Sequence, residues 1–134
     1  MNLQKLHDVT KTQRVNKSEA REVIYHILAQ RDNVVSVVDL LKYIAKNYTK
    51  KISQNTLYRH LNFFSENGLV IVLQDRLKRA YYYINDDECP CFRICTKCTT
   101  IEKVVKPESF DKPFGNCDYV TIHQKCKSCE GELS

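Results

Sequence analysis

The sequence contains no long apolar run, no internal repeat and no low-complexity segment. A membrane-spanning helix needs about 18 or more consecutive apolar residues, so we expect no transmembrane segment. The first 15 residues carry scattered charges and lack an apolar stretch, so no secretory signal is visible and we expect a cytoplasmic protein. In a reducing cytosol, metal ligation or redox chemistry is a commoner role for cysteine than a structural disulfide.

Cysteine is absent from the first 83 of the 134 residues, and this absence divides the chain. Residues 1–83 hold 14 Lys and Arg against 7 Asp and Glu, whereas residues 84–134 hold 7 against 9 together with all seven cysteines. A hydrophobic fraction of 43% is enough for a globular core. We therefore predict two domains, a basic one over residues 1–84 and a cysteine-rich one over residues 85–134, and the helices and strands expected in them make the fold class α+β.

Three helices followed by a β-hairpin are predicted in the first domain. Three serines each precede a segment with apolar residues at helical spacing, as N-cap residues do: Ser18, Ser36 and Ser53. Gly68 stands where the third helix would end. Two strands are predicted over residues 69–73 and 80–84, joined by a basic connection. This order is that of a winged helix whose hairpin, the wing, has a basic tip.

The predicted third helix and its surroundings carry side chains suited to DNA. Arginine pairs with guanine edges, asparagine and glutamine pair with adenine, and tyrosine or threonine can contact a thymine methyl group or a phosphate. Each of these residues could instead belong to a solvated helix face, but the whole set within a basic half favours double-stranded DNA. The candidate DNA-binding residues are Gln54, Asn55, Thr56, Tyr58, Arg59, Lys50, Lys51, Arg76 and Lys78, and His60 is expected on the same outward face.

Two CxxC pairs, Cys95 with Cys98 and Cys126 with Cys129, are separated by 27 residues. We call them the first and second knuckles. Zinc takes four thiolates at about 2.3 Å in a tetrahedron, and each knuckle can supply two of them. A thioredoxin-like site needs only one CxxC within a βαβ unit, which is not predicted here, and a disulfide pair is the other alternative. We predict one structural Zn²⁺ per chain, which would stabilise a domain too small for a large core.

The remaining cysteines suggest a second metal site, which would act as a sensor. In an extended segment Cys89 and Cys91 point to the same face, and alternation in the strand 117–123 places Cys117 and His123 together. The alternative is that Cys117 is a small buried side chain and that His123 is a surface residue. The candidate sensor residues are Cys89, Cys91, Cys117, His123, Glu108 and Asp118.

The order of these parts resembles the ferric uptake regulator family. Residues 52–61 are similar to the family's IS-x-x-TVYR-x-L recognition helix, residues 66–70 are similar to its E-x-GLV, and the paired knuckles match its structural zinc site. The resemblance covers about residues 15–129. It implies that Tyr58 and Arg59 contact bases and backbone, that the second domain dimerises and senses metal, and that a homodimer binds an AT-rich palindromic operator.

The chain also departs from the family pattern. The His-rich run before the first knuckle is replaced by Cys89-Pro90-Cys91-Phe92, and the hinge-site His and Glu are replaced by Asn33 and Tyr83. The family's last-strand histidine falls at or beside Asp118, next to Cys117. The spacing between the knuckles is shorter than in the family, and two prolines within it argue against a long dimerisation helix.

These departures shape the functional prediction. Soft thiolates favour zinc over Fe(II), so we expect a zinc-responsive repressor of metal-uptake genes, with an iron-responsive member as the alternative. An exposed Cys-x-Cys segment can also be oxidised, which leaves thiol sensing open. A zinc-ribbon module that binds RNA or protein is the competing class. A thiol oxidoreductase is disfavoured because no basic partner for Cys89 or Cys91 is visible, and we expect no enzyme and no small-molecule substrate.

Overall fold

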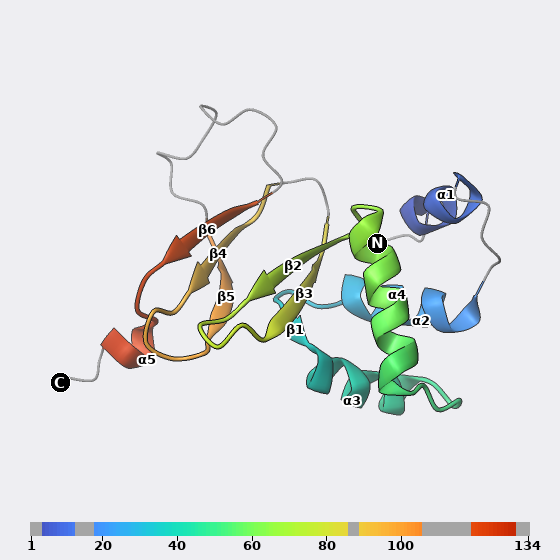
Figure 1. Cartoon of the computed structure of the whole chain (residues 1–134), viewed down its shortest axis with the longest axis horizontal. Helices are drawn as coiled ribbons and strands as arrows, with labels where there is room; N and C mark the ends of the chain where they lie inside the picture. The colour runs from blue at the N-terminus through green and yellow to red at the C-terminus, as the bar shows by residue number, and fades with distance from the viewer. Residues whose placement is uncertain (1–3, 13–17, 86–88, 106–118, 131–134) are drawn as a thin grey trace.

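The computed structural model describes residues 4–12, 18–85, 89–105 and 119–130 (Figure 1). Its helices are α1 (Gln4–Thr12), α2 (Glu19–Ala29), α3 (Val37–Asn47), α4 (Gln54–Glu66) and α5 (Lys127–Glu130). Its strands are β1 (Val35–Ser36), β2 (Val70–Gln74), β3 (Ala80–Ile84), β4 (Cys91–Ile94), β5 (Ile101–Val104) and β6 (Val120–His123). None of the helices in these ranges is both long and apolar enough to cross a membrane.

The three serines predicted as N-cap residues cap the helices α2, α3 and α4. The hydroxyls of Ser18, Ser36 and Ser53 each accept a hydrogen bond at 3.2 Å from the backbone N–H three residues further on. Gly68 follows α4 with a φ of +69°, a left-handed conformation that glycine adopts without strain. The three helices and the two hairpin strands of the winged helix are therefore confirmed.

Two elements of the winged helix were not predicted. The helix α1 precedes the three predicted ones, and its Leu6 is buried in the same core. The two-residue strand β1 pairs with β3, so the first sheet has the order β1-β3-β2. Both elements are short and carry few apolar residues, and local periodicity therefore gives little sign of them.

The core of the winged helix lies between the helices and this sheet. From α4 it takes Leu57, Leu61 and Phe64, all without exposed surface. His60 is only 8% exposed, so the prediction that it faces outward was wrong. It lies three residues after Leu57 and four before Phe64, which places it on the same buried stripe of the helix.

The second sheet has the order β5-β4-β6, with β4 antiparallel to β5 and parallel to β6. Its two faces differ. Phe92 and Ile94 of β4 pack against β2 and β3 of the first sheet, whereas Cys91 and Arg93 point to the opposite face. Figure 1 shows this sheet and α5 on one side of the molecule and the helices α1–α4 on the other.

The two sheets share a small apolar cluster. Ile71, Leu73 and Tyr83 of the wing strands meet Phe92, Ile94 and Ile101 of the second sheet. The rings of Tyr83 and Phe92 are in edge contact, with centroids 5.1 Å apart. The boundary that we predict between residues 84 and 85 thus falls between β3 and β4, and packing crosses it.

Candidate DNA-binding surface and metal centre

The four knuckle cysteines come together beside the second sheet. The Sγ atoms of Cys95 and Cys129 are 3.8 Å apart, those of Cys98 and Cys126 are 3.7 Å apart, and all four lie within 4.8 Å of one another. Four sulfurs bound at about 2.3 Å in a tetrahedron would be separated by about 3.8 Å. All four are free thiols, so the disulfide alternative does not apply to them in this structure. The cluster has the dimensions of a tetrahedral metal site.

Backbone amides prepare Cys95 to be a thiolate. The N–H groups of Lys97, Cys98 and Cys126 donate to its Sγ at 3.3–3.4 Å. The N–H of Cys98 above all, opposed by burial, lowers the pKa of the Cys95 thiol to about 6. Burial, together with the neighbouring sulfurs, raises the pKa of Cys129 to about 12. A thiolate at Cys129 therefore needs a cation beside it, which a metal ion bound by the cluster would supply.

A disulfide occupies one of the predicted sensor positions. Cys89 is disulfide-bonded, whereas the other five cysteines that the structure describes are free thiols. Its partner therefore lies outside the described residues. A disulfide sulfur is not a thiolate ligand, so Cys89 can bind metal only after reduction. We expected metal ligation or redox chemistry to be commoner than disulfides among these cysteines, and Cys89 is an exception. Local sequence does not reveal this disulfide, because it depends on a partner elsewhere in the chain.

The described sensor residues do not form a second metal cluster. Among the residues in the described ranges, the knuckle cysteines are the only group of three or more potential ligands this close together. Cys91 is paired with Val120 and Ile94 is paired with His123, so Cys91 and His123 point to opposite faces of the sheet. The remaining candidates, Glu108, Cys117 and Asp118, lie outside the described residues.

The two hinge positions hold packing residues. The Asn33 side-chain oxygen accepts hydrogen bonds from the N–H groups of Val34 and Lys103, both at 2.8 Å, and so ties the loop after α2 to β5. Tyr83 is buried, and the ammonium group of Lys103 lies 5.2 Å from the centroid of its ring. These contacts connect the two halves and leave neither residue as a metal ligand.

The helix α4 presents most of the predicted DNA-binding residues to solvent. Gln54, Asn55 and Arg59 are exposed, and Tyr58 is 38% exposed, which is high for a tyrosine on a packed helix. Thr56 is half-buried, and its hydroxyl accepts a hydrogen bond from that of Ser53 at 2.9 Å, so part of its hydrogen-bonding capacity serves the helix cap.

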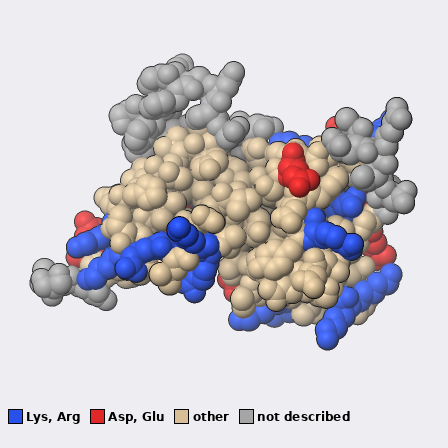
Figure 2. Space-filling model, viewed as in Figure 1, with Lys and Arg blue, Asp and Glu red and all other residues tan. Residues whose placement is uncertain are grey.

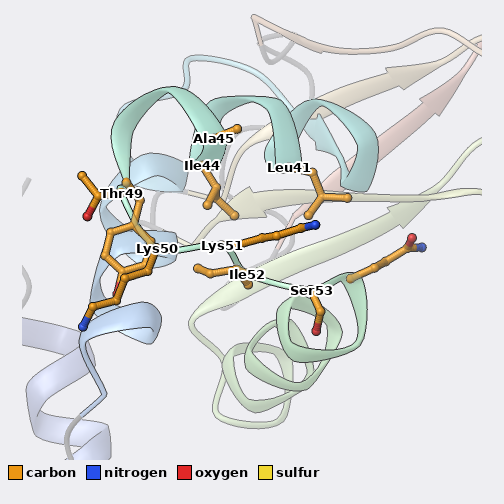
Figure 3. Close-up of a pocket in the computed structure, with 10 residues that line it drawn as sticks. Leu41, Ile44, Ala45, Thr49, Lys50, Lys51, Ile52 and Ser53 are labelled. Carbon is orange, nitrogen blue, oxygen red and sulfur yellow. The ribbon is translucent and has the colours of Figure 1, made fainter.

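A hollow of about 550 Å³ separates the end of α3 from the start of α4 (Figure 3). Its apolar wall includes Leu41 and Ile44, and the exposed Lys50 and Lys51 stand on its rim. Figure 3 shows these two lysines pointing in different directions. Lys50 also forms an exposed ion pair with Glu19 at 3.4 Å, an interaction too weak to prevent a phosphate from competing for the lysine.

The wing is organised by Asp75, a residue that sequence reasoning missed. Its buried carboxylate accepts hydrogen bonds from the N–H groups of Leu77 and Arg79, the guanidinium of Arg79 and the hydroxyl of Tyr81, all at 2.8–3.0 Å. Burial alone would raise its pKa, but these donors outweigh burial and the pKa of Asp75 is lowered. The sequence signal that could have identified Asp75 is its position at the start of the turn between the two predicted strands, where an aspartate commonly accepts hydrogen bonds from the backbone N–H groups that follow it.

The wing and α4 border a common hollow of about 590 Å³. Tyr58 lines it from α4, and Lys78 and Arg79 line it from the wing. Arg76 and Lys78 are exposed at the wing tip. Tyr58 of α4 and the wing cations therefore line the same space, an arrangement suited to a duplex that contacts both elements.

Solved structures with the same fold come from bacterial metal regulators. The ferric uptake regulator of Helicobacter pylori, described with three functional metal-binding sites, has a TM-score of 0.76 and 23% identity over 98% of this chain and 93% of that one. The ferric uptake regulator of Francisella tularensis, solved with iron, has a TM-score of 0.63 and 25% identity over 86% of this chain and 94% of that one. The zinc uptake regulator FurB of Mycobacterium tuberculosis has a TM-score of 0.50 and 20% identity over 82% of this chain and 92% of that one. Among curated protein sequences, none matches this chain.

Fold and site together define a winged-helix protein with a cluster of four cysteines that could hold a metal ion. The sequence profile of the ferric uptake regulator family matches residues 12–113, which is most of the chain. The chain belongs to the ferric uptake regulator family, and so to the metal-responsive transcriptional regulators.

Proposed function

We propose that this protein is a homodimeric, zinc-responsive repressor that binds an AT-rich palindromic DNA duplex. The observation that supports DNA binding best is the exposed face of α4, which carries Tyr58 and Arg59, with Tyr58 lining the same hollow as the basic wing. In this proposal Arg59 and the side-chain amides of Gln54 and Asn55 contact base edges. Lys50, Lys51 and the wing cations contact phosphates.

Zinc is the ion proposed for the knuckle site. Four thiolates in a tetrahedron suit Zn²⁺, and the separations between the sulfurs leave room for one ion bound by all four. A site of this kind is filled permanently, so it maintains the fold but cannot report a zinc concentration. The proposed response therefore requires a second, weaker site, for which Cys89 and Cys91 in their reduced form are the candidates among the described residues, beside Glu108, Cys117 and Asp118 outside them.

DNA binding is tested with the full chain and a labelled AT-rich palindromic duplex, with single-stranded RNA as competitor. Replacing a helix-face arginine removes about 1–3 kcal/mol of recognition without disturbing the core. We therefore expect Arg59→Ala to weaken duplex binding by about 5- to 150-fold at unchanged zinc content. Lys11→Ala, which removes one charge from exposed α1, is the matched control. Equal binding by Arg59→Ala and the parent contradicts the recognition role of α4.

Metal response is tested by elemental analysis and by duplex titration over buffered free zinc, in the presence of a reductant. Combined Cys89→Ser and Cys91→Ser should leave one tightly held zinc per chain, because the knuckles are untouched. The same variant should lose the dependence of DNA binding on added zinc, since serine hydroxyls are poor zinc ligands. A double variant that responds to zinc like the parent excludes these two cysteines as the sensor.

The disulfide of Cys89 favours a second candidate function, a response to thiol oxidation. Reduction by a cellular thiol or dithiol would break the S–S bond with two electrons and two protons and release two thiols. Only then can Cys89 act as a metal ligand, so oxidation and metal binding would compete for one sulfur. Duplex binding that differs between the oxidised and the reduced protein at fixed zinc supports this candidate, and equal binding contradicts it.

A further inference from the structure

We propose that the turn of the first knuckle, residues 95–100, extends the DNA-binding surface, with Lys97 contacting a backbone phosphate next to the wing. This inference rests on the proposed function. It assigns a second role to a segment that otherwise serves only to hold metal.

The first observation is that the wing and this turn lie side by side. The hydroxyl of Tyr81, on β3, is 3.0 Å from Asp75 Oδ2 and 3.5 Å from the backbone oxygen of Thr99. Below this contact, Leu73 and Tyr81 of the wing pack against Ile94 and Ile101, which flank the turn. Figure 1 shows the β2–β3 and β4–β5 turns emerging on the same edge of the molecule.

The second observation is that both turns are held in shape by buried acceptors. The carboxylate of Asp75 fixes the wing, as described above. In the knuckle, the N–H groups of Lys97 and Cys98 both donate to Cys95 Sγ at 3.3 Å. The backbone that carries Lys97 is therefore held by the sulfur of Cys95, and the hydroxyl of Tyr81 connects this turn with the wing through its contact with Thr99. A preorganised cation loses less conformational freedom when it binds a phosphate.

The third observation is charge. Residues 76–80 contain three Lys and Arg, residues 95–100 contain Lys97, and neither segment contains Asp or Glu. Arg76, Lys78, Thr96 and Lys97 are exposed or partly exposed. Figure 2 shows Lys and Arg side chains gathered along the edge where the two turns lie. The positive charges of the wing are thus followed by Lys97 and the hydroxyl of Thr96 in the neighbouring turn. Such a row of groups suits the phosphates that recur along a duplex.

The test is the salt dependence of duplex binding. Each phosphate that the protein no longer neutralises should reduce the slope of log K against log salt by about 0.9 in magnitude. We expect Lys97→Gln to show this reduction with one zinc per chain retained, and Lys97→Arg to keep the parent slope. Lys125→Gln is the matched control, since it removes the same charge from the approach to the second knuckle.

The effect of Arg59→Ala on the same duplex separates this inference from the proposed function. The inference is overturned if Lys97→Gln matches the parent or matches Lys125→Gln, while Arg59→Ala still weakens binding. If the parent does not bind the duplex at all, the proposed function fails, and this inference fails with it.

Discussion

In the winged helix, sixteen buried apolar residues from α1–α4, the first sheet and the connection between α4 and β2 form one cluster. The second sheet contributes only Phe92, Ile94 and Ile101 to a cluster of six, which it shares with the wing strands. Beyond it lie the four knuckle sulfurs, three of them buried, which form a cluster of their own. These counts refer to the residues that the structure describes.

The difference indicates two sources of stability. Each buried aliphatic or phenylalanine side chain of the winged helix contributes about 1.5–3 kcal/mol relative to exposure, and a cluster of sixteen buried apolar residues is enough for a small domain. Three apolar residues are not enough for the second sheet, which shares its cluster with the wing strands, and in the function proposed above a metal bound by the knuckles supplies the remaining stability. The predictions below test this division, beginning with the largest effect.

Removing one knuckle sulfur should unfold the second sheet and leave the winged helix folded. Metal binding contributes on the order of 10–16 kcal/mol in small zinc domains. We expect Cys98→Ser to lose its tightly bound zinc and the order of the second sheet, while the helices keep a cooperative melt by circular dichroism. Thr96→Ser, in the same turn, is the control. A Cys98→Ser protein with parental zinc content and a single parental melt would show that the knuckles do not form one site.

A cavity in the winged helix should have a smaller effect and should spare the metal. Leu61 is fully buried in α4, and truncation of such a leucine costs about 2–5 kcal/mol. We expect Leu61→Ala to lower the free energy of unfolding in urea by this amount with one zinc per chain retained. The adjacent, exposed Asn62→Ala should change stability by less than about 0.5 kcal/mol. Zinc loss in Leu61→Ala would contradict the separation of the two sources of stability.

A substitution at Tyr81 tests whether its hydroxyl links the wing to the first knuckle. Removing its hydroxyl deletes the hydrogen bond to Asp75 and the contact with Thr99, while the other three donors to Asp75 remain. We expect Tyr81→Phe to cost about 0.5–1.5 kcal/mol and to raise amide exchange in the wing. Tyr82→Phe, on the neighbouring position that points to the other face, is the comparison. Unchanged exchange in Tyr81→Phe would remove this hydroxyl as a link between wing and knuckle.

Sequence patterns predicted the winged helix more completely than the second domain. Serine caps and Gly68 are local signals, and each acts within four residues of its own position. The CxxC spacing likewise identified the four sulfurs that the structure brings together.

The features that sequence reasoning missed depend on contacts between distant segments. The parallel pairing of β4 with β6 joins residues about 30 positions apart and separates Cys91 from His123. The disulfide of Cys89 also depends on a partner elsewhere. His60 is a different case, because a polar residue on an apolar stripe was assigned to the surface by type rather than by position. The helical period alone would have placed it inside.

His60 supplies the smallest predicted effect, a pH dependence that belongs to the winged helix alone. Burial lowers its pKa, and the positive charges of Arg21 and Arg59 lower it further. The unfolded chain therefore takes up a proton near pH 6.5 while the folded protein does not. Stability should be complete above this pH and should fall as the pH drops toward the lowered folded-state pKa, with a slope of at most about 1.4 kcal/mol per pH unit.

Urea unfolding between about pH 7.5 and 5.5 measures this slope against a matched pair of variants. His60→Gln should flatten the slope, whereas His26→Gln, on the exposed face of α2, should leave it as in the parent. Knuckle cysteines that release zinc in acid contribute equally to all three proteins, so the difference between parent and His60→Gln isolates the buried imidazole. If the two variants and the parent show the same slope, the acid sensitivity lies in the metal site, and the winged helix contributes none of it.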